Sequence, residues 1–587
     1  MAAAALMAMP LALNAQTNYY VKAPHDLTTA TPEGTADGSS WDKAISLQQA
    51  LAKVKAGDCI FAKGYTAGEA TGKDFYYTVP DRKGFVLPSG VRMYGGFAGN
   101  ETEISPDNLD TQANDPRGCV GSDLSHMKYR SVLTADIDCN DTVSDTWLLF
   151  PQNSTRKDNA RHVVTMSLAP TAVNPNAGND PTVLNGFYIV GGNASDSDDS
   201  YGGGVYITDA GTADNNTGER GYDVSRCFFT NNYAERGGAI YVAANVKPNA
   251  NRRAYIRYNT LFNNVAGTRG ADDNLGGGLW AEGRADIVNN LVYCNINGGM
   301  RVSEATTVVN NTISRNNSAG IDHVSPDKNN KLTVYNTIVW GNHRLNKYSP
   351  APHFSHGAYY THRGEANPGD DTNVVLEESN NAADGATPNF KDPVTSARYD
   401  RSYIWTTTDY PQWSYAIDYG SALIAKGDPT QYKSATWGDR ALSADNRFGT
   451  ADNNTTTIDI GAYAYTKVPA SRRRYVKTAA NGGNDDNDGL TWATAYASPQ
   501  KAIDALNDGT GQRGEVWVAA GTYAPSAHIT KDTNSPVAFL MHSGINVFGG
   551  FRGTETSIDQ RDGYYDGSDD DQPNRDSQYT WKFHEEY

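Results

Sequence analysis

Two adjacent pairs of residues carry the side chains best suited to acid–base chemistry. Asp322 precedes His323, and Asp272 precedes Asp273. Carboxylates can bind a divalent cation or accept a proton, and an imidazole exchanges a proton near neutral pH. The simpler interpretation of both pairs is structural, since Asp272 and Asp273 lie in a stretch typical of an exposed turn. We therefore assign no catalytic residue and keep these four as candidates.

Two acidic loops offer the closely spaced oxygen donors that a hard cation such as Ca²⁺ prefers. The first contains Asp196, Asp198 and Asp199, and the second contains Asp485, Asp486 and Asp488. Neither loop completes an EF-hand, because the distant glutamate is missing at the required place. A solvated turn is the simpler interpretation of both loops, so no metal site is assigned, and Ca²⁺ is the one cofactor considered.

Three closely spaced histidines, His353, His356 and His362, could also bind a metal, although histidines in loops more often face water. The sequence has no P-loop, dinucleotide fingerprint, H-E-x-x-H or G-x-S-x-G element in the strand and helix context that each requires. Nucleotide-driven and zinc-protease chemistry are thereby disfavoured.

The composition favours an all-β protein. The 587 residues include 57 Gly and 35 Tyr, and they are rich in Asn, Asp and Thr, which suits strands joined by tight turns. The formal net charge of −17 disfavours nucleic acid and acidic membrane surfaces as partners. A short basic run, Arg472 to Arg474, is interpreted as a solvated linker.

The five cysteines are too few and too scattered for a disulfide scaffold or a metal cluster. Cys119 and Cys139 could pair in an oxidising compartment. Cys227 and Cys294 are interpreted as small apolar residues that fill a core, and Cys59 has no assigned role.

The first 15 residues are apolar and end in a small residue before Gln16, which resembles the apolar core and cleavage site of a secretory signal. The basic start typical of such signals is missing. No later segment has 18 consecutive apolar residues, so no transmembrane helix is predicted. We expect the protein to be exported.

Two passages about 450 residues apart share their motifs and spacing. Residues 37–41 read D-G-S-S-W and residues 95–102 read G-G-F-A-G-N-E-T, while residues 488–492 and 549–556 read D-G-L-T-W and G-G-F-R-G-T-E-T. Duplication of a domain start explains this order. Each start also holds a short helical stretch, predicted at 47–54 and 500–506, that would cover the first hydrophobic layer of an elongated β-stack.

Between residues 130 and 345, Asn repeatedly precedes three or four residues of strong β-propensity. The Asn residues at 259, 290, 311 and 336 are 31, 21 and 25 residues apart, about one coil of a parallel β-helix. Coils stack about 4.8 Å apart, so an Asn at the same bend of each coil can pass amide hydrogen bonds along the stack. The predicted ladder consists of Asn231, Asn259, Asn290, Asn311 and Asn336.

Paired glycines in residues 202–204, 237–238 and 276–278 each precede an apolar strand and permit sharp corners. Phe228-Phe229-Thr230-Asn231, followed by Gly237-Gly238-Ala239-Ile240, resembles the paired units of the polymorphic outer-membrane protein repeats. Residues 421–428 and 458–463 are similar to the closing signature of choice-of-anchor β-helix proteins, with Ala464 where that family usually has Glu. The resemblance implies a right-handed parallel β-helix on a Gram-negative cell surface or outer membrane.

Pectate lyases and polygalacturonases share this fold and place acidic and basic residues on neighbouring coils. Ile321-Asp322-His323 resembles a fragment of the pectate-lyase W-I-D-H motif, but Gly320 stands where the tryptophan would be. The polygalacturonase motifs are missing as a set. An enzyme of this kind is therefore an alternative rather than the first expectation.

The sequence thus predicts an all-β, right-handed parallel β-helix with a small N-terminal α/β cap, followed by the start of a second such module. The expected ranges are a signal-like segment at 1–15, a cap and first coils at 19–110, a body at 111–465, a linker at 466–474, and a truncated second module at 475–587. The expected function is that of a secreted adhesin or stalk that binds a glycan or a surface protein through its loops. The alternatives are a polysaccharide lyase or glycoside hydrolase, and a structural envelope repeat without a ligand.

Overall fold

In the computed structural model the chain divides into two compact units, residues 1–466 and 467–587. The described residues are 16–30, 36–66, 69, 73–106, 109, 115–117, 127–141, 154–167, 181–195, 200–209, 221–246, 253–267, 275–303, 306–324, 332–345, 352–360, 371–378, 386–392, 414–417, 421–430, 458–463, 468, 470–508, 514–525, 527–528, 536–542, 545–556 and 560.

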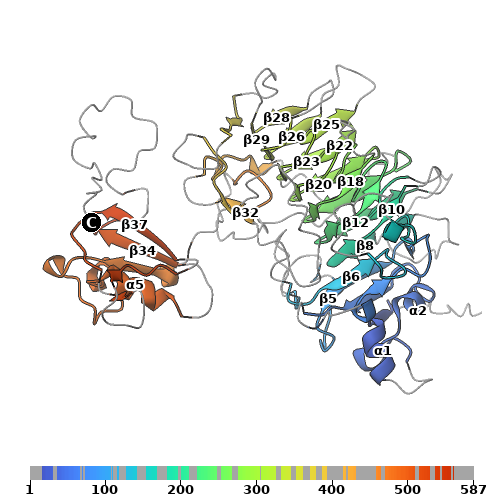
Figure 1. The fold of residues 1–587 in the computed structure, drawn as a ribbon, viewed down its shortest axis with the longest axis horizontal. Coiled ribbons are helices and arrows are strands. Elements are labelled where there is room, and N and C mark those ends of the chain that lie inside the picture. Colours follow the sequence, from blue (N-terminus) through green and yellow to red (C-terminus); the bar gives the residue numbers. More distant parts are fainter. Residues whose placement is uncertain are drawn as a thin grey trace, which may run out of the picture. The chain divides into compact units, whose positions relative to one another are not determined.

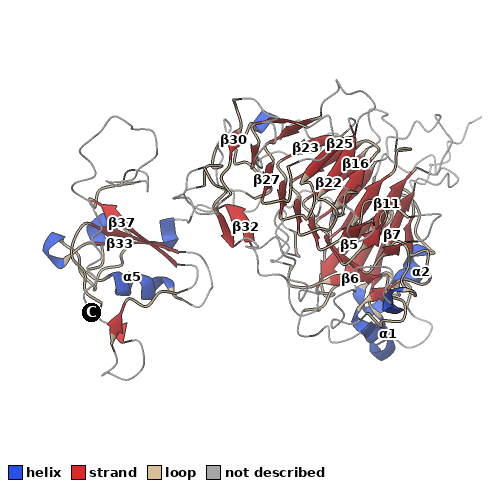
Figure 2. Cartoon of the chain, turned by 45° about the horizontal axis from the view of Figure 1, so that its top comes forward, coloured by secondary structure: helices blue, strands red, loops and turns tan. Residues whose placement is uncertain are grey.

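Unit 1 is a parallel β-helix with three long sheets, and a complete coil contributes one strand to each of them (Figures 1 and 2). The hand is the right-handed one expected of parallel crossovers, so the predicted fold class is confirmed.

The sheet that begins with β1, called the β1 sheet, has ten parallel strands in the order β1 (Asn18–Val21), β2 (Cys59–Lys63), β5 (Arg92–Phe97), β8 (Thr182–Asn185), β12 (Tyr222–Ser225), β16 (Ala254–Arg257), β20 (Ala285–Val288), β23 (Thr307–Val309), β26 (Thr333–Tyr335) and β28 (His353–Ser355).

The β3 sheet also has ten parallel strands, in the order β3 (Tyr77–Thr78), β6 (Ser131–Thr134), β9 (Phe187–Val190), β13 (Phe228–Thr230), β17 (Thr260–Phe262), β21 (Leu291–Tyr293), β24 (Thr312–Ser314), β27 (Ile338–Trp340), β29 (Ala358–Tyr359) and β30 (Val374–Val375).

The β4 sheet has seven parallel strands, in the order β4 (Phe85–Leu87), β7 (Val164–Ser167), β11 (Val205–Thr208), β15 (Ile240–Val242), β19 (Leu279–Ala281), β22 (Met300–Ser303) and β25 (Ile321–Val324). A narrow parallel sheet is formed by three short strands, β10 (Asn193–Ala194), β14 (Tyr233–Ala234) and β18 (Val265–Ala266). In the sequence, each of them follows a strand of the β3 sheet and precedes a strand of the β4 sheet. An antiparallel pair, β31 (Phe390–Asp392) and β32 (Ser414–Ile417), follows the coils.

The core of unit 1 consists of columns of inward side chains, one residue from each coil. In the β1 sheet one such column runs through Val224, Ile256, Ile287, Val308 and Val334, and each member is fully buried. Successive strand residues point to opposite faces, so every second residue of a strand joins such a column. The β-branched residues of the sequence therefore supply a continuous apolar interior.

A ladder of buried side-chain amides lies at the bend between the β1 and β3 sheets. Nδ2 of Asn259 donates to Oδ1 of Asn290, and Nδ2 of Asn290 donates to Oδ1 of Asn311, each at 3.0 Å. The same oxygens also accept the backbone N–H groups of Asn259 and Asn290. At the next coil Thr337 takes the place of asparagine, and its Oγ1 accepts the N–H of Asn311 at 3.2 Å.

A second ladder, which the sequence analysis missed, lies at the next bend, at the end of the β3 sheet. Its amides are connected in the same way through five asparagines, Asn232, Asn264, Asn295, Asn316 and Asn342. In several coils the residue just before the ladder member has a positive φ, for instance Asn231 at 56° and Asn263 at 55°, a conformation that Asn tolerates better than most residues.

Two predicted ladder members belong elsewhere. Asn231 precedes a member of the second ladder, and its Oδ1 accepts from Nδ2 of Asn263 at 3.0 Å. Asn336 precedes Thr337 at the first bend, and its side chain exchanges two 2.8 Å hydrogen bonds with the backbone of Asp428. Each was off by one position from a ladder, because neighbouring asparagines look alike in sequence.

The described parts of one late segment of unit 1, residues 421–430 and 458–463, pack back on the coils. Besides the contacts of Asn336, Nδ2 of Asn310 donates to the carbonyls of Asp459 and Gly461, and the N–H of Ala462 donates to Oγ1 of Thr312. Sequence positions about 150 residues apart are thereby fastened together. This segment is called the closing segment.

The predicted cap helix is confirmed, although it is shorter than expected. Helix α2 (Leu47–Leu51) begins at Ser46, whose hydroxyl accepts the N–H of Gln49 while the Gln49 side chain accepts the N–H of Ser46. This capping box pairs two of the N–H groups left over at the helix start. Leu47 and Ala50 face the core beside β1. The other helices among the described residues of unit 1 are α1 (Pro24–Ala30) and the 3-10 helices η1 (Trp41–Lys43), η2 (Lys73–Phe75) and η4 (Ser154–Arg156).

Unit 2 repeats the opening of unit 1. Its parallel sheet has the order β33 (Arg473–Val476), β34 (Gly514–Ala519) and β37 (Ile545–Phe551), and helix α5 (Pro499–Leu506) confirms the second predicted helix. The register shifts between Trp517 and Ala519, as it does between Phe61 and Lys63 in unit 1. The other elements in the described part of unit 2 are η6 (Ala470–Arg472), η7 (Ala479–Asn481), η8 (Trp492–Thr494), β35 (Ala527–His528) and β36 (Val537–Ala538).

The interpretation of Arg472 to Arg474 as a solvated linker is wrong for two of the three residues, since Arg473 and Arg474 begin β33. The guanidinium of Arg473 lies 3.8 Å from the ring centroid of Trp517 and forms a 3.1 Å ion pair with Glu515. The run therefore helps to hold the first two strands of unit 2 together.

The two predicted core cysteines are buried. Cys227 and Cys294 lie among apolar side chains, and burial raises the pKa of each thiol to about 12. Cys139 is a free thiol, and Cys119 lies outside the described residues. In the part of the chain that is described, no helix combines the length and the apolar character needed to cross a bilayer.

The first ladder predicts a large loss of stability on Asn290→Ala. This change would leave the N–H and Nδ2 of Asn259 and the carbonyls of Ile256 and Val288 with fewer partners inside the protein. Since a buried polar group without a partner costs about 1–3 kcal/mol, we expect the free energy of unfolding to fall by about 2–4 kcal/mol in urea denaturation.

Asn245→Ala is the matched control. Asn245 is exposed and bonds Thr208 and Asp209 at the surface, so its loss should cost less than about 1 kcal/mol. If both variants lowered the free energy of unfolding equally, the buried ladder would contribute no more to stability than a surface hydrogen bond.

Candidate functional site

Along strands β8, β12, β16 and β20, the outer face of the β1 sheet is covered by the protein's own side chains. Its outward carboxylates are fully buried, and Asp223 forms a bidentate pair with Arg257 while Asp286 binds Arg253 at 2.6 Å. Arg226 reaches from the same face to the carbonyl of Leu109. This face is therefore used to attach the segment that contains Leu109.

The outer face of the β3 sheet is covered too. The outward rings of Tyr293 and Trp340 lie 5.1 Å and 5.7 Å from those of Tyr415 and Phe390, which belong to β32 and β31. Residues of the closing segment, such as Ile460, join the same cluster. A second apolar layer thus shields this sheet.

The β4 sheet differs, because its strands alternate between buried and accessible residues. In β4, β7, β11 and β22 every second residue is partly or fully accessible, as expected of a sheet with one solvated face. Its main outward column, one residue from each coil, is called the open face. It consists of Val86, Thr165, Tyr206, Tyr241, Trp280, Arg301 and Asp322.

Aromatic rings occupy the middle of the open face. Tyr206 and Tyr241 are 5.9 Å apart between ring centroids, and Tyr241 and Trp280 are 6.4 Å apart. Tyr201, from the preceding corner, stacks on Tyr241 at 4.6 Å with an interplanar angle of 22°. Tyr201 and Tyr206 are half-buried and keep accessible surface, whereas Tyr241 and Trp280 are buried beneath their neighbours.

Two arginines lie over these rings. The guanidinium of Arg301 is 4.3 Å from the Trp280 centroid, and that of Arg236 is 4.9 Å from it. Arg236 is also 3.4 Å from Glu282 and keeps 45% of its side-chain surface exposed. Burial and the nearby Glu282 carboxylate raise the pKa of Tyr241 above its usual value, so its hydroxyl stays protonated and can donate a hydrogen bond.

The candidate pair Asp322 and His323 occupies β25, but the two side chains belong to opposite faces of the strand. Asp322 continues the open face beside Arg301, and His323 aligns with the inward Val302. Nδ1 of His323 accepts the N–H of Leu332 at 3.4 Å. Both residues are almost fully buried. The two groups therefore cannot act together on one substrate.

No model of a known protein family matches this sequence, and no curated protein is detectably similar to it. Two solved structures share some of its shape. Pectate lyase Pel9A has a TM-score of 0.33 at 11% identity, over 77% of this chain and 97% of that one. The PL6 family alginate lyase AlyGC has a TM-score of 0.17 at 11% identity, over 86% of this chain and 65% of that one.

These likenesses are too weak to carry an argument about function. The parallel β-helix is established by the strand order itself, and the resemblance to polymorphic outer-membrane repeats and choice-of-anchor proteins stays a prediction.

In the acidic loop of unit 2, the carboxylates of Asp485 and Asp488 accept hydrogen bonds that hold the neighbouring turns. Oδ1 of Asp485 accepts the N–H groups of Ala497 and Ser498, and Oδ1 of Asp488 accepts from Leu490 and Thr494. These hydrogen bonds hold the pKa of Asp488 below its usual value. Asp486 is exposed beside them.

Several other candidates lie outside the described residues, namely Asp196, Asp198, Asp199, Asp272, Asp273 and His362. His353 lies on β28, and His356 has a positive φ of 50° at the bend that follows. Among the described side chains, no group of three or more His, Cys, Asp or Glu residues could hold a metal ion.

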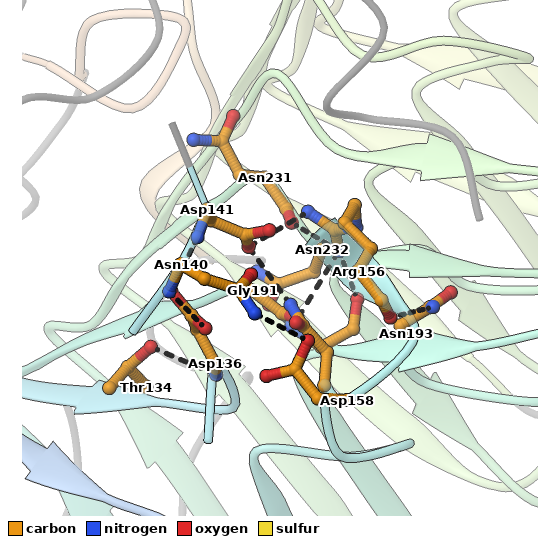
Figure 3. A network of polar contacts seen from close by, with 12 residues as sticks. Thr134, Asp136, Asn140, Asp141, Arg156, Asp158, Gly191, Asn193, Asn231 and Asn232 are labelled. Carbon is orange, nitrogen blue, oxygen red and sulfur yellow. Dashed lines mark hydrogen bonds and ion pairs between the residues drawn. The ribbon is translucent and has the colours of Figure 1, made fainter. Parts of the chain in front are cut away.

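A polar network that sequence reasoning missed surrounds Arg156 (Figure 3). Nη2 of the buried Arg156 donates to the carbonyls of Gly191, Gly192 and Asn231, and its Nη1 lies 3.9 Å from Asp141. The guanidinium thereby joins three carbonyls at the bend after the β3 sheet. The sequence feature that could have indicated this network is the close spacing of four polar residues, Asp136, Asp138, Asn140 and Asp141.

Asp136 is the group in this network with the clearest electrostatic shift. It accepts the N–H groups of Asn140 and Asp141, and both contacts favour its charged form. Burial and the carboxylates of Asp141 and Asp158 oppose that form more strongly and raise the pKa of Asp136 to about 6.

This shift predicts a pH dependence of stability. An unfolded Asp has a pKa of about 3.9, so between about pH 4 and pH 6 the folded state holds a proton that the unfolded state releases. The contribution of Asp136 to the free energy of unfolding is then fully present below about pH 4 and is lost as the pH rises through about 6. We expect urea denaturation at steps from pH 4 to pH 7 to show that the free energy of unfolding of the wild type falls relative to that of Asp136→Asn as the pH rises.

Asp37→Asn is a control of opposite sign, because hydrogen bonds from the hydroxyl and N–H of Ser39 lower the pKa of Asp37. The difference in free energy of unfolding between the wild type and Asp37→Asn should change only as the pH falls below about 4. A constant difference between wild type and Asp136→Asn from pH 4 to pH 7 would contradict the assignment.

Proposed function

We propose that this protein is a secreted surface β-helix that binds a glycan chain along the open face. The observation that supports this most directly is the column of Tyr206, Tyr241 and Trp280 on the β4 sheet, with Tyr201 beside it. It lies on a long sheet whose described outward residues stay accessible in several coils.

The chemistry of this column suits a sugar polymer. Aromatic rings offer flat apolar surface to the C–H face of a sugar, and tyrosine hydroxyls and guanidinium groups offer hydrogen bonds to its hydroxyls. Coils repeat about every 4.8 Å, which is comparable to the length of one sugar unit. A chain that runs along the stack would therefore meet an equivalent position at each coil.

The glycan would contact the accessible members of the site. Tyr201 and Tyr206 are half-buried, and Arg236 is the most exposed of the arginines over the rings. Tyr241 and Trp280 lie beneath them and hold them in place. The rings are mutually packed in the structure, so little ordering is left to occur on binding.

Binding without cleavage is the preferred form of the proposal. The buried Asp322 and the inward His323 offer no acid and base on a common substrate. A polysaccharide lyase or glycoside hydrolase, and an envelope repeat without a ligand, remain the alternative outcomes of the experiment below. Export and attachment to a cell surface are part of the proposal, and the signal-like first 15 residues support export.

The experiment is a panel of acidic and neutral polysaccharides, with binding measured by calorimetry and cleavage followed through unsaturated products and new reducing ends. We expect at least one glycan to bind without cleavage. Tyr206→Ala should weaken that binding about tenfold, which corresponds to about 1.4 kcal/mol.

Tyr360→Ala is the matched control, because Tyr360 is also half-buried but packs on the cluster that covers the β3 sheet. It should leave the affinity unchanged. An equal loss in both variants, or the absence of any bound glycan, would contradict the proposal, and cleavage of a bound glycan would favour the enzyme alternative.

A further inference from the structure

Unit 2 exposes apolar side chains that a folded β-helix would normally bury. Phe539 is 37% exposed, Met541 is 55% exposed and Val547 is 38% exposed. These three residues are called the apolar end face. Large apolar side chains left open to water can mark an interaction surface.

The same three positions can be identified in unit 1. Residues 539–551 read F-L-M-H-S-G-I-N-V-F-G-G-F, and residues 85–97 read F-V-L-P-S-G-V-R-M-Y-G-G-F. The strand pairing agrees with this alignment, since Val547 pairs with Val516 of β34 as Met93 pairs with Ile60 of β2.

Further details support the equivalence. Glu101 accepts the N–H groups of Ala98, Gly99 and Asn100, and Glu555 accepts those of Arg552, Gly553 and Thr554. The turn that follows the third strand of each sheet is therefore built alike in the two units.

In unit 1 the counterparts belong to the core. Phe85, Leu87 and Met93 are 1%, 0% and 0% exposed. They are buried because the next coil lies on them: Phe85 and Leu87 of β4 pair with Val164 and Met166 of β7. Met93 of β5 likewise pairs with Leu184 of β8.

We propose that the apolar end face of unit 2 is the seat of a further β-helix coil. Its strands would run parallel to β37 and to residues 539–541, in the register that β8 takes on β5 and that β7 takes on β4. β37 is an edge strand of the sheet β33-β34-β37, so the incoming strand extends this sheet. Unit 2 then acts as a cap on which a second stack is built.

The observations favour this occupant over a glycan or a second copy. The exposed positions correspond to the interior columns of unit 1, and the open face of unit 1 is made of other, outward positions. A coil with inward apolar residues fills such columns in register, whereas a sugar has no comparable apolar surface.

The test supplies such a coil from the protein itself. In the full chain, residues 105–466 are attached after Ile558, the position that corresponds to Ile104 in unit 1. We expect the attached residues to form a second protease-resistant β-helix with its own cooperative transition in calorimetry. Val547→Asp and Met541→Asp should each speed proteolysis of this second stack by about tenfold or more, because each places a charge inside the new core.

Leu490→Asp is the control within unit 2. Leu490 is 43% exposed, yet its counterpart in unit 1, Ser39, is polar and exposed, so this position lies outside any core. The variant should leave proteolysis of the second stack unchanged.

Two outcomes would overturn the proposal. In the first, the attached residues stay protease-sensitive while the native unit 1 stays folded. In the second, the original chain self-associates and Val547→Asp abolishes this association, which would make a second copy the occupant. Neither outcome bears on glycan binding, which is measured at unit 1.

Discussion

Buried amide hydrogen bonds between successive coils are the constraint on which unit 1 depends. Each ladder asparagine uses its oxygen for the coil before it and its Nδ2 for the coil after it and for nearby carbonyls. A shift of one residue would leave these groups unpaired in an apolar interior, where each costs about 1–3 kcal/mol. The register of every sheet, and thus which side chain faces outward in each coil, follows from this requirement.

The order of the aromatic column follows from the same register. Tyr206, Tyr241 and Trp280 come from coils of different length, since the first two are 35 residues apart and the last two are 39 residues apart. The additional residues lie between strands and leave the register unchanged. A site made of one residue per coil can therefore be kept while the connections differ.

Much of the fold could be predicted from spacing. Asn259, Asn290 and Asn311 form the expected ladder, and both predicted helices are present. The second ladder, five residues further along in each coil, carried an equal signal that was overlooked. In the next coil the ladder position is held by Thr337 and not by the predicted Asn336. Spacing could not show this, because a threonine takes the place of the asparagine on which the pattern is based.

The open face was beyond sequence reasoning for a different reason. Tyrosines and tryptophans are outward on all three sheets, and the difference lies in what covers them. Phe390 and the closing segment, far along the chain, shield the β3 sheet. Likewise Asp322 and His323 looked like a functional pair until the strand placed them on opposite faces.

The equal rise of the coils has a consequence for how such a molecule changes in size. Since each strand of the β4 sheet adds one outward position to the same line, gain or loss of a whole coil changes the length of that line in integer steps and leaves the other steps untouched. The length of such a surface can therefore evolve by the number of coils, without a change in the shape of any one of them.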